Sequence, residues 1–416
     1  MTSATRSSLA DTLLIISAGI EAIPGIRRAR ERGLHVVVSD ANPHAPGVGH
    51  ADDFLQACTY DPAATIAAAR DYHCNVRPLS GVMTIASDVP LTVASVAAEL
   101  NLPGIPLESA RLASDKLAMK QRFARDNVPI PWFMPIADAA ELRRVVGEQQ
   151  RLLVIKPVDS RGARGVLRLT DDVDLDWAFA HAQRYSPTQR VMVEAYLDGP
   201  QISTETLMLD GVAHTLGFSD RNYELLNQFA PHIIEDGGDL PSHLPAAQCD
   251  AVKAVVAQAA LSMGIRNGVV KGDMVVHRGR PHVIELAARL SGGYFCSHEI
   301  PLNSGVDFVG HAISLALGER IDRQTLAPRF NRHVSQRYLF PRPGRVVRID
   351  GADEVAAWPD ISLCEVRVKL GDVVGPANCH PARAGVVIAT GADREQAMLR
   401  AMQAVRSISI VTEPVA

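Results

Sequence analysis

A lysine stands at the end of an apolar segment, and a basic loop with glycines follows it. Residues 152–157 predict a buried strand that ends in Lys156-Pro157, where a lysine needs a partner for its charge. Residues 158–165 hold two arginines and two glycines and lead into a second expected strand at 166–169. Backbone N–H and guanidinium groups in such a loop can bind phosphate oxygens. The alternative is an ordinary solvated hairpin tip.

Two acidic residues occupy expected neighbouring strands further along the chain. Alternation over 269–277 places Lys271 and Asp273 on one face, and Glu285, Ala287 and Arg289 share one face of the returning strand. A three-residue loop at 278–280 would then pair Asp273 with Glu285 and Lys271 with Ala287.

Facing carboxylates at these two positions indicate a cation between them, because like charges directly opposite destabilise a sheet. Acidic oxygen ligands suit Mg²⁺ or Mn²⁺, which keep waters and bridge substrate phosphates. A two-residue turn would put Asp273 and Glu285 on opposite faces and remove this argument. An ordinary exposed hairpin with mixed charges is the remaining alternative.

A third segment, 191–199, predicts an apolar strand that contains Glu194 and ends at Gly199. The backbone at such a strand end can bind an adenine edge through one C=O and one N–H, although half-buried strands of this kind are common. Gln201, Ser203 and Glu205 then share one face of the next strand, and Asp210-Gly211 predicts a two-residue hairpin turn.

The elements that must position these residues begin with alternating strands and helices. Strands are expected at 13–17, His35–Asp40 and 81–85, and helices at 27–32 and 90–100. This alternation predicts a parallel, doubly wound sheet. We expect Ser114 to cap a helix that runs to about residue 126. Further helices are expected at 251–263 and 394–407.

Composition restricts the class of protein. Hydrophobic residues make up 47% and charged residues 21% of 416, which excludes a disordered chain, a collagen and a coiled coil. The net charge of −4 argues against nucleic-acid or membrane-surface binding. Six scattered cysteines without a C-x-x-C pair fit the cytoplasm. Arg6 before the short apolar run 13–20 is a weak signal-peptide feature, and we expect an N-terminal extension instead.

Taken in order, these segments resemble the ATP-grasp superfamily over about residues 10–410, and most closely its carboxylate–amine ligases, which are related to biotin carboxylase-like and L-amino acid ligase-like enzymes. The resemblance rests on Ser114-Asp115-Lys116, Ile155-Lys156-Pro157 with its loop, the segment 193–200, Asp273 and the segment 283–293. It implies an α/β (α+β) fold with three parts. These are an N-terminal α/β domain at 1–112, an ATP-grasp domain at 113–330 with a mobile lid at about 128–200, and a small C-terminal α+β domain at 331–416.

The resemblance also implies roles for individual residues. Lys116 and Lys156 would bind ATP phosphates, Asp273 and Glu285 would hold Mg²⁺, and Arg289 would stabilise the transferring phosphoryl group. The remaining nucleotide contacts would come from the loop residues Ser160, Arg161, Gly162 and Gly165, from Glu194, Tyr196 and Leu197 at the adenine, and from Gln201 at the ribose.

One position departs from the family pattern. Many relatives carry an asparagine two residues after the metal-binding glutamate, and here that residue is Ala287. We expect that one metal ion is held more loosely, or that a water molecule replaces the missing asparagine ligand. Alternatively, Lys271 places a fixed positive charge near the phosphates.

Substrate contacts are expected from polar residues around the core. These are Glu205, Asp220, Arg221, Ser291, Gly292, Gly293 and His298. The stretch 219–243 has an ordinary surface loop as its alternative interpretation. Cys296 lacks a base partner for a nucleophilic role, and the glycine spacing after the first strand does not fit a dinucleotide fold.

The leading hypothesis for function is an ADP-forming ligase that joins an amino acid or small carboxylic acid to an amine through an acyl phosphate. The first alternative is a carboxylase, or a formate- or bicarbonate-activating enzyme of the purine-synthesis type. The second is an ATP-binding regulatory protein without catalysis, which only Ala287 supports. The expected partners are small molecules, not nucleic acid or membrane. Dimers are common in the family, so the resemblance implies a homodimer.

Overall fold

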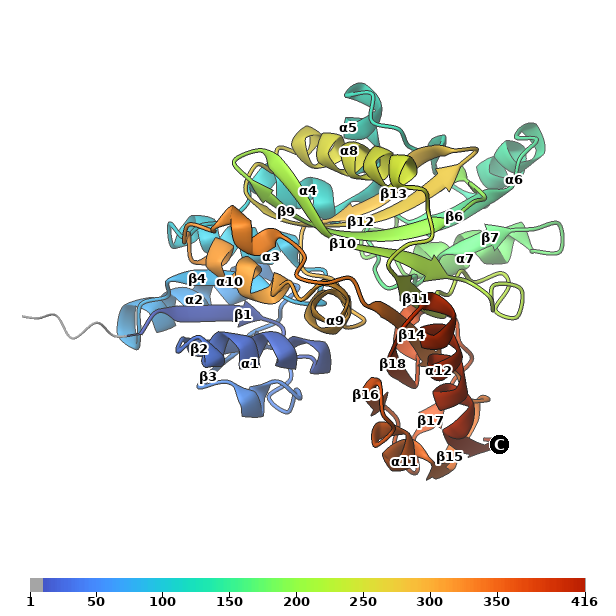
Figure 1. The fold of residues 1–416 in the computed structure, drawn as a ribbon. Coiled ribbons are helices and arrows are strands. Elements are labelled where there is room, and N and C mark those ends of the chain that lie inside the picture. The colour runs from blue at the N-terminus through green and yellow to red at the C-terminus, as the bar shows by residue number, and fades with distance from the viewer. Residues whose placement is uncertain (1–9, 416) are drawn as a thin grey trace, which may run out of the picture.

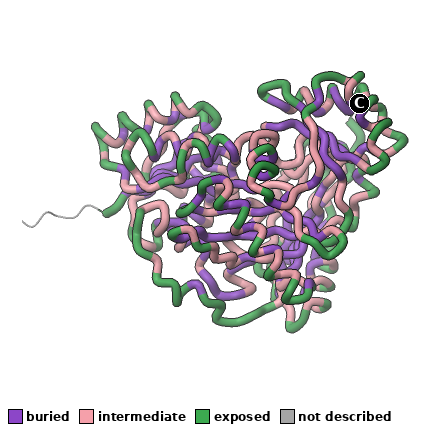
Figure 2. The backbone as a smooth tube through the Cα atoms, turned by 90° about the horizontal axis from the view of Figure 1, so that it is seen from above, coloured by how far each residue is buried: buried purple, intermediate pink, exposed green. Residues whose placement is uncertain are grey.

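The computed structural model describes residues 10–415, so Arg6 and the expected N-terminal extension before residue 10 lie outside the described residues. Three regions are visible in Figure 1: an α/β region at the N-terminus, a central sheet with a smaller sheet beside it, and a C-terminal region. Buried residues follow the strands of each region, and exposed residues concentrate in the connections (Figure 2). All six cysteines are free thiols.

The N-terminal sheet is parallel, with the order β3-β2-β1-β4. Its strands are β1 (Thr12–Ile16), β2 (His35–Asp40), β3 (Asp53–Gln56) and β4 (Gly81–Thr84). Leu13 and Ile15 pack toward α1 (Ile23–Glu31) and α10 (Phe308–Ala316), whereas Leu14 and Ile16 pack toward α2 (Pro62–Asn75) and α3 (Pro90–Glu99). Helices therefore cover both faces, which confirms the doubly wound sheet.

The cap of the next helix differs from the prediction. Two helices meet here, α4 (Leu107–Ser114) and α5 (Lys116–Arg125). Asp115 is the N-cap residue of α5, and its carboxylate accepts a hydrogen bond from the N–H of Ala118 at 2.9 Å. Ser114 instead donates to the carbonyl of Ala110 inside α4. The prediction of Ser114 was wrong because Ser and Asp are both good caps and the sequence alone does not rank adjacent candidates.

A separate four-stranded sheet lies within the segment that we expect to form the lid. It has the order β5-β8-β6-β7 and consists of β5 (Phe133–Ile136), β6 (Leu153–Pro157), β7 (Leu167–Leu169) and β8 (Val191–Ala195). The helices α6 (Ala139–Glu148) and α7 (Leu175–Arg184) complete its hydrophobic core. β6 and β7 are antiparallel, as predicted for the strands that flank the basic loop.

The largest sheet has eight strands in the order β13-β12-β9-β10-β11-β14-β18-β16. They are β9 (Gln201–Leu209), β10 (Val212–Asn222), β11 (Gly237–Leu240), β12 (Gly268–His277), β13 (Arg280–Ala287), β14 (His333–Leu339), β16 (Ile361–Val366) and β18 (Gly385–Gly391). Asp210-Gly211 connects β9 to β10 as predicted, with positive φ at both residues. α8 (Ala246–Ser262) contributes Val252 and Val256 to the core beside this sheet.

The C-terminal strands continue the central sheet through the β11–β14 pair. A small sheet lies beyond them, formed by β15 (Gly344–Asp350), β17 (Val373–Val374) and β19 (Ser409–Glu413). The helices of this region are α11 (Ala352–Ala356) and α12 (Arg394–Ser407), the latter with the predicted bounds. Short helical turns and α9 (Ile300–Ser304) complete the fold: Ile20–Ala22, Val48–His50, Phe295–Glu299, Arg323–Leu326 and His380–Ala382.

Candidate active site

A cavity of about 570 Å³ brings together residues from every region of the fold. The N-terminal region contributes Glu21 and Asp88 to its lining, and the basic loop contributes Ser160 to Arg164. The central sheet contributes Asp273, and the C-terminal region contributes Arg367 and Arg383 among its lining residues. Glu21 and Asp88 both follow a strand of the parallel N-terminal sheet, at the carboxyl ends where ligands bind in such sheets.

The β12–β13 hairpin places two carboxylates side by side, but not in the way that the sequence argument assumed. The turn has two residues, Arg278 and Gly279, and His277 pairs with Arg280. A register shift between Asp273 and Met274 then leaves an extra residue, Ile284, on β13. This bulge restores the pairing of Asp273 with Glu285 and of Lys271 with Ala287. The predicted pairing is therefore confirmed, whereas the predicted three-residue loop is wrong.

Cations from the protein surround these two carboxylates. Asp273 contacts the guanidinium of Arg221 at 2.9 Å and also the ammonium of Lys271, and Glu285 contacts Lys116 at 3.0 Å. Burial by itself would raise the pKa of Asp273, but the charges of Arg221 and Lys271 outweigh burial and hold that pKa well below its usual range. These cations therefore favour the ionised form of Asp273.

The two carboxylates fit a magnesium site that relies on few protein ligands. Within residues 10–415 no group of three or more His, Cys, Asp or Glu side chains converges as a metal cage. Mg²⁺ is commonly held by one or two carboxylates, with waters and substrate phosphates completing its shell. Asp273 and Glu285 supply such a pair inside the cavity, and Ala287, two residues after Glu285 on β13, pairs with Lys271.

A buried triad fixes the lysine at the end of β6. Lys156 contacts one oxygen of Glu194 at 2.5 Å, and Lys120 contacts the other at 2.7 Å. All three side chains are nearly inaccessible to solvent. Burial lowers the pKa of Lys120 to about 8. Our sequence reasoning missed Lys120, although its spacing of four from Lys116 places both lysines on one face of α5.

The basic loop is closed over the cavity through contacts to three other regions. Lys116 donates to the carbonyl of Ser160 at 2.6 Å, and the guanidinium of Arg161 lies 3.6 Å from the ring centre of Tyr60. The N–H of His380 donates to the carbonyl of Gly162 at 2.9 Å. These contacts join the loop to α5, to the N-terminal region and to the C-terminal region.

The end of β8 offers free backbone groups beside the cavity. Tyr196 and Leu197 line it, and so does Gln201 at the start of β9. The N–H of Tyr196 donates to Leu152, whereas that of Leu197 has no hydrogen-bond partner in the described part of the chain. A free donor at this position suits an acceptor nitrogen of an adenine ring, as expected from the resemblance.

Arg289 lies at the junction of the central and N-terminal sheets. Its Nε donates to Asp88 at 2.6 Å, and the neighbouring Leu290 accepts a hydrogen bond from Ala86. Burial opposes ionisation of Arg289, but Asp88 more than compensates and raises the pKa of the guanidinium above its usual value. The cavity therefore contains a permanent positive charge at this point, next to Ser291, Gly292 and Gly293, which line it as predicted.

Four of the predicted site residues do not line the cavity. Gly165 packs against Pro157, where an added Cβ would lie 2.9 Å from the proline ring. Glu205 is fully buried beneath the sheet surface and accepts a hydrogen bond from the N–H of Ser291 at 3.0 Å. His298 lies against Tyr294, while its neighbour Glu299 lines the cavity.

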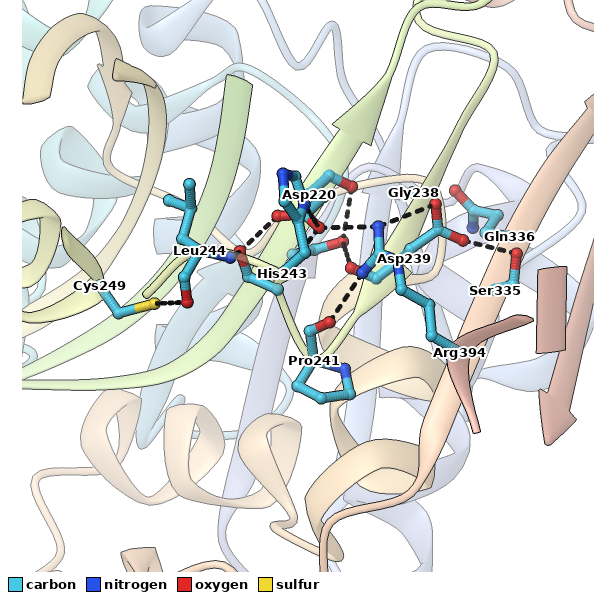
Figure 3. Close-up of polar contacts among 12 residues, drawn as sticks. Asp220, Gly238, Asp239, Pro241, His243, Leu244, Cys249, Ser335, Gln336 and Arg394 are labelled. Carbon is cyan, nitrogen blue, oxygen red and sulfur yellow. Dashed lines mark hydrogen bonds and ion pairs between the residues drawn. The ribbon is translucent and has the colours of Figure 1, made fainter. Parts of the chain in front are cut away.

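Asp220 is the fourth, and it belongs to a polar cluster on the other side of β10. Its carboxylate accepts hydrogen bonds from the backbone N–H of His243 and from Ser242, and it contacts Arg394 at 2.8 Å (Figure 3). Arg394 also donates to the carbonyl of Pro241. Because side chains alternate along a strand, Arg221 points into the cavity and Asp220 points away from it.

The C-terminal region supplies cavity residues that no motif revealed. Arg367 contacts Glu21 at 2.7 Å, and Arg383 stacks on Tyr338 with its guanidinium carbon 3.7 Å from the ring centre. The stretch 219–243, which had a surface loop as its alternative interpretation, contributes Tyr223 and Glu235. Among the other cavity residues that sequence reasoning missed, Glu21 and Asp88 carried a signal, because each follows a predicted strand of the parallel sheet at its carboxyl end. None of the helices between residues 10 and 415 is long and apolar enough to cross a membrane.

Comparison with known families agrees with this architecture. Residues 26–104 match the ATP-grasp N-terminal domain, residues 113–293 the ATP-grasp domain, and residues 337–413 the L-amino acid ligase C-terminal domain 2. The chain therefore belongs to the ATP-grasp superfamily and is a ligase of its carboxylate–amine type, which confirms the resemblance drawn from the motifs.

Individual relatives are distant. The "Uncharacterized protein y4rH" of Sinorhizobium fredii is 28% identical over 341 residues, covering 81% of this chain and 69% of the relative. A D-alanine–D-alanine ligase of Delftia acidovorans is 24% identical over 46% of this chain and 61% of its own length. The crystal structure of L-amino acid ligase from Bacillus licheniformis superposes with a TM-score of 0.82 at 22% identity, covering 98% and 100% of the two chains. The crystal structure of biotin carboxylase from Campylobacter jejuni superposes with a TM-score of 0.71 at 19% sequence identity, covering 96% of this chain and 92% of the other.

Proposed function

We propose that this protein is an ATP-dependent ligase that joins a small carboxylic acid, such as an amino acid, to an amine through an acyl phosphate, and releases ADP and phosphate. The observation that carries the proposal is the ring of cations around the facing carboxylates Asp273 and Glu285. Lys116, Lys271 and Arg221 each contact one of these carboxylates inside the cavity. Such an arrangement suits the dense negative charge of a nucleoside triphosphate and its metal ion.

The protein contributes position and charge to phosphoryl transfer. Lys116 and Lys156 line the cavity and would bind phosphate oxygens, and Asp273 with Glu285 would hold the metal ion. A bound Mg²⁺ supplies charge neutralisation and alignment of the phosphates. Arg289 follows Glu285 by four residues and also lines the cavity, where its permanent charge can stabilise the transferring group or the tetrahedral intermediate.

Two chemical steps follow from this arrangement. The substrate carboxylate attacks the γ-phosphate, so that an O–P bond forms and ADP leaves. The amine then attacks the acyl carbon, the C–N bond forms, and phosphate leaves. The closed loop with Arg161 and Gly162 keeps water away, which matters because an acyl phosphate hydrolyses readily.

Further charges that line the cavity favour an amino acid as one substrate. Arg367 and Arg383 supply cations there, whereas Glu21 and Glu299 supply carboxyl groups. A zwitterion requires both kinds of partner.

The free cysteines agree with the cytoplasmic location that we expect.

The test is product analysis of ATP turnover with Mg²⁺ and a panel of amino acids, given singly and in pairs. We expect ADP, phosphate and a new amide mass with a particular pair. Glu285→Gln is the matched control, and it should lose turnover because one metal-binding carboxylate is gone.

Other outcomes would contradict the proposal. ADP release with bicarbonate or formate but without an amide would indicate the carboxylase-type alternative. Tight ATP binding that Glu285→Gln alters, with no turnover on any pair, would indicate a regulatory ATP-binding protein.

A further inference from the structure

Glu299 differs from every other carboxylate in the cavity. The cavity is lined by seven acidic side chains, and six of them have a lysine or arginine within ion-pair distance. The six are Glu21, Asp88, Glu194, Glu235, Asp273 and Glu285. The carboxyl group of Glu299 has no hydrogen bond or ion pair with any residue between 10 and 415, although the residue is only 2% exposed. A buried carboxyl group without a partner is costly, which indicates that its partner is a ligand.

The groups around Glu299 reinforce this interpretation. Glu235 and Asp239 add negative charge near Glu299, Arg337 adds positive charge, and Tyr338 on β14 lines the same cavity. Arg337 is already paired with Asp239 at 3.0 Å, so its charge is committed elsewhere. Burial, with Glu235 and Asp239 adding to it, raises the pKa of Glu299 well above its usual value. A cationic ligand group beside Glu299 would lower that pKa again and favour the carboxylate form.

The local backbone holds this side chain in place. Glu299 is the last residue of the π-helical turn Phe295–Glu299, and its N–H donates to the carbonyl of Tyr294 at 3.2 Å. Wide turns of this kind recur at functional sites. Gly238 on β11 lies beside the carboxyl group, and a Cβ added there would come within 3.9 Å of the glutamate oxygen. Glu299 itself lines the cavity, so its position at the cavity wall is fixed.

We propose that Glu299 binds the ammonium group of the amine substrate and accepts one of its protons before the attack on the acyl phosphate. The inference rests on the proposed ligase function, because only that reaction needs a neutral amine. The ammonium group transfers a proton to the glutamate oxygen, and the freed nitrogen electron pair forms the C–N bond. The C–O bond to phosphate then breaks, and the second nitrogen proton leaves with phosphate as the amide forms. Glu299 returns its proton to water after product release.

Hydroxylamine separates this step from the first half of the reaction. It is uncharged at neutral pH, so it can trap the acyl phosphate as a hydroxamate without first losing an ammonium proton. We would measure amide and hydroxamate formation with wild type, Glu299→Gln and Glu299→Asp. Ser297→Ala is the matched control, since Ser297 belongs to the same turn, contacts His298 and does not line the cavity.

We expect Glu299→Gln to lower the kcat for amide formation by roughly 100-fold or more, the usual contribution of general-base catalysis. Hydroxamate formation and ATP affinity should stay within about threefold of wild type, because the first step does not use the ammonium site. Glu299→Asp should recover part of the amide rate, and Ser297→Ala should match wild type in both reactions.

The inference is overturned if Glu299→Gln forms amide at the wild-type rate, or if it loses amide and hydroxamate formation equally. If Glu299→Gln does not fold, the same comparison between Glu299→Asp and wild type decides the question. A wild-type protein that gives no hydroxamate with any carboxylate would instead contradict the proposed ligase function itself, so the two failures are distinguishable.

Discussion

Asp273 and Glu285 are direct cross-strand neighbours, yet each carboxylate is held by a different cation of the protein. Arg221 and Lys271 contact Asp273, whereas Lys116 contacts Glu285. The protein itself thus relieves the repulsion between two acids that face each other on a sheet. A metal ion that binds here must share these carboxylates with lysine and arginine, so the cations influence its affinity directly.

Lys271 should therefore matter for both ATP and metal dependence. We expect Lys271→Ala to lower ATP turnover by roughly 10- to 100-fold, because a charge-assisted interaction worth about 1.5–3 kcal/mol is lost beside the phosphates. The dependence of turnover on Mg²⁺ concentration should also shift. Turnover measured over a magnesium titration checks this, with Lys253→Ala on α8 as the control. An unchanged ATP and magnesium dependence would refute a role for Lys271 opposite Ala287.

Tyr60 should stabilise the closed position of the basic loop. The guanidinium of Arg161 lies over its ring, and such a cation–π contact at a half-exposed site is worth about 0.5–1 kcal/mol. We expect Tyr60→Ala to raise the KM for ATP by roughly two- to fivefold. The fraction of ATP hydrolysed without amide formation should also rise, because water reaches the acyl phosphate. Tyr60→Phe keeps the ring and should behave as wild type; equal behaviour of the two variants would contradict this role.

Glu205 should make the protein less stable at alkaline pH. Burial raises its pKa to about 7 from the ordinary 4.5. Between these values the unfolded chain has released the proton and the folded chain retains it, so stability falls as pH rises through this window, and the loss is complete above pH 7. Glu205→Gln keeps an acceptor for the N–H of Ser291 and removes the ionisation.

We expect the stability advantage of Glu205→Gln over wild type to be about 2 kcal/mol larger at pH 8 than at pH 5. Urea unfolding at the two pH values measures it, with Glu395→Gln on the exposed face of α12 as the control. A difference that does not change with pH would show that Glu205 does not titrate between these values.

Local patterns were sufficient for most elements of the fold but not for all contacts between them. The strand at His35–Asp40 and the helix at Arg394–Ser407 have their predicted bounds because hydrophobic spacing and caps are local. The pairing of Asp273 with Glu285 was predicted for the wrong reason. The bulge at Ile284 arises in the pairing of the edge strand β13 with β12, and the residue types in 280–287 do not encode it.

The candidate site was predictable where its residues follow motif spacing, and not where distant segments meet. Lys120 could have been found from helical periodicity, since it lies one turn after Lys116. Arg367 and Arg383 could not, because they reach the cavity only through the docking of the C-terminal strands beside β11. Asp220 and Arg221 were both predicted to contact substrate, but adjacent residues of a strand point to opposite faces, and only Arg221 lines the cavity.

The most direct test of the acyl phosphate follows one oxygen atom. The carboxylate substrate found in the panel would be labelled with oxygen-18 in both carboxyl oxygens, and the released phosphate would be analysed by mass. Our account predicts one labelled oxygen in each phosphate released with an amide, because the attacking carboxylate oxygen stays on phosphorus when the C–O bond breaks. Unlabelled phosphate released together with the amide would contradict an acyl phosphate and with it the mechanism proposed for this site.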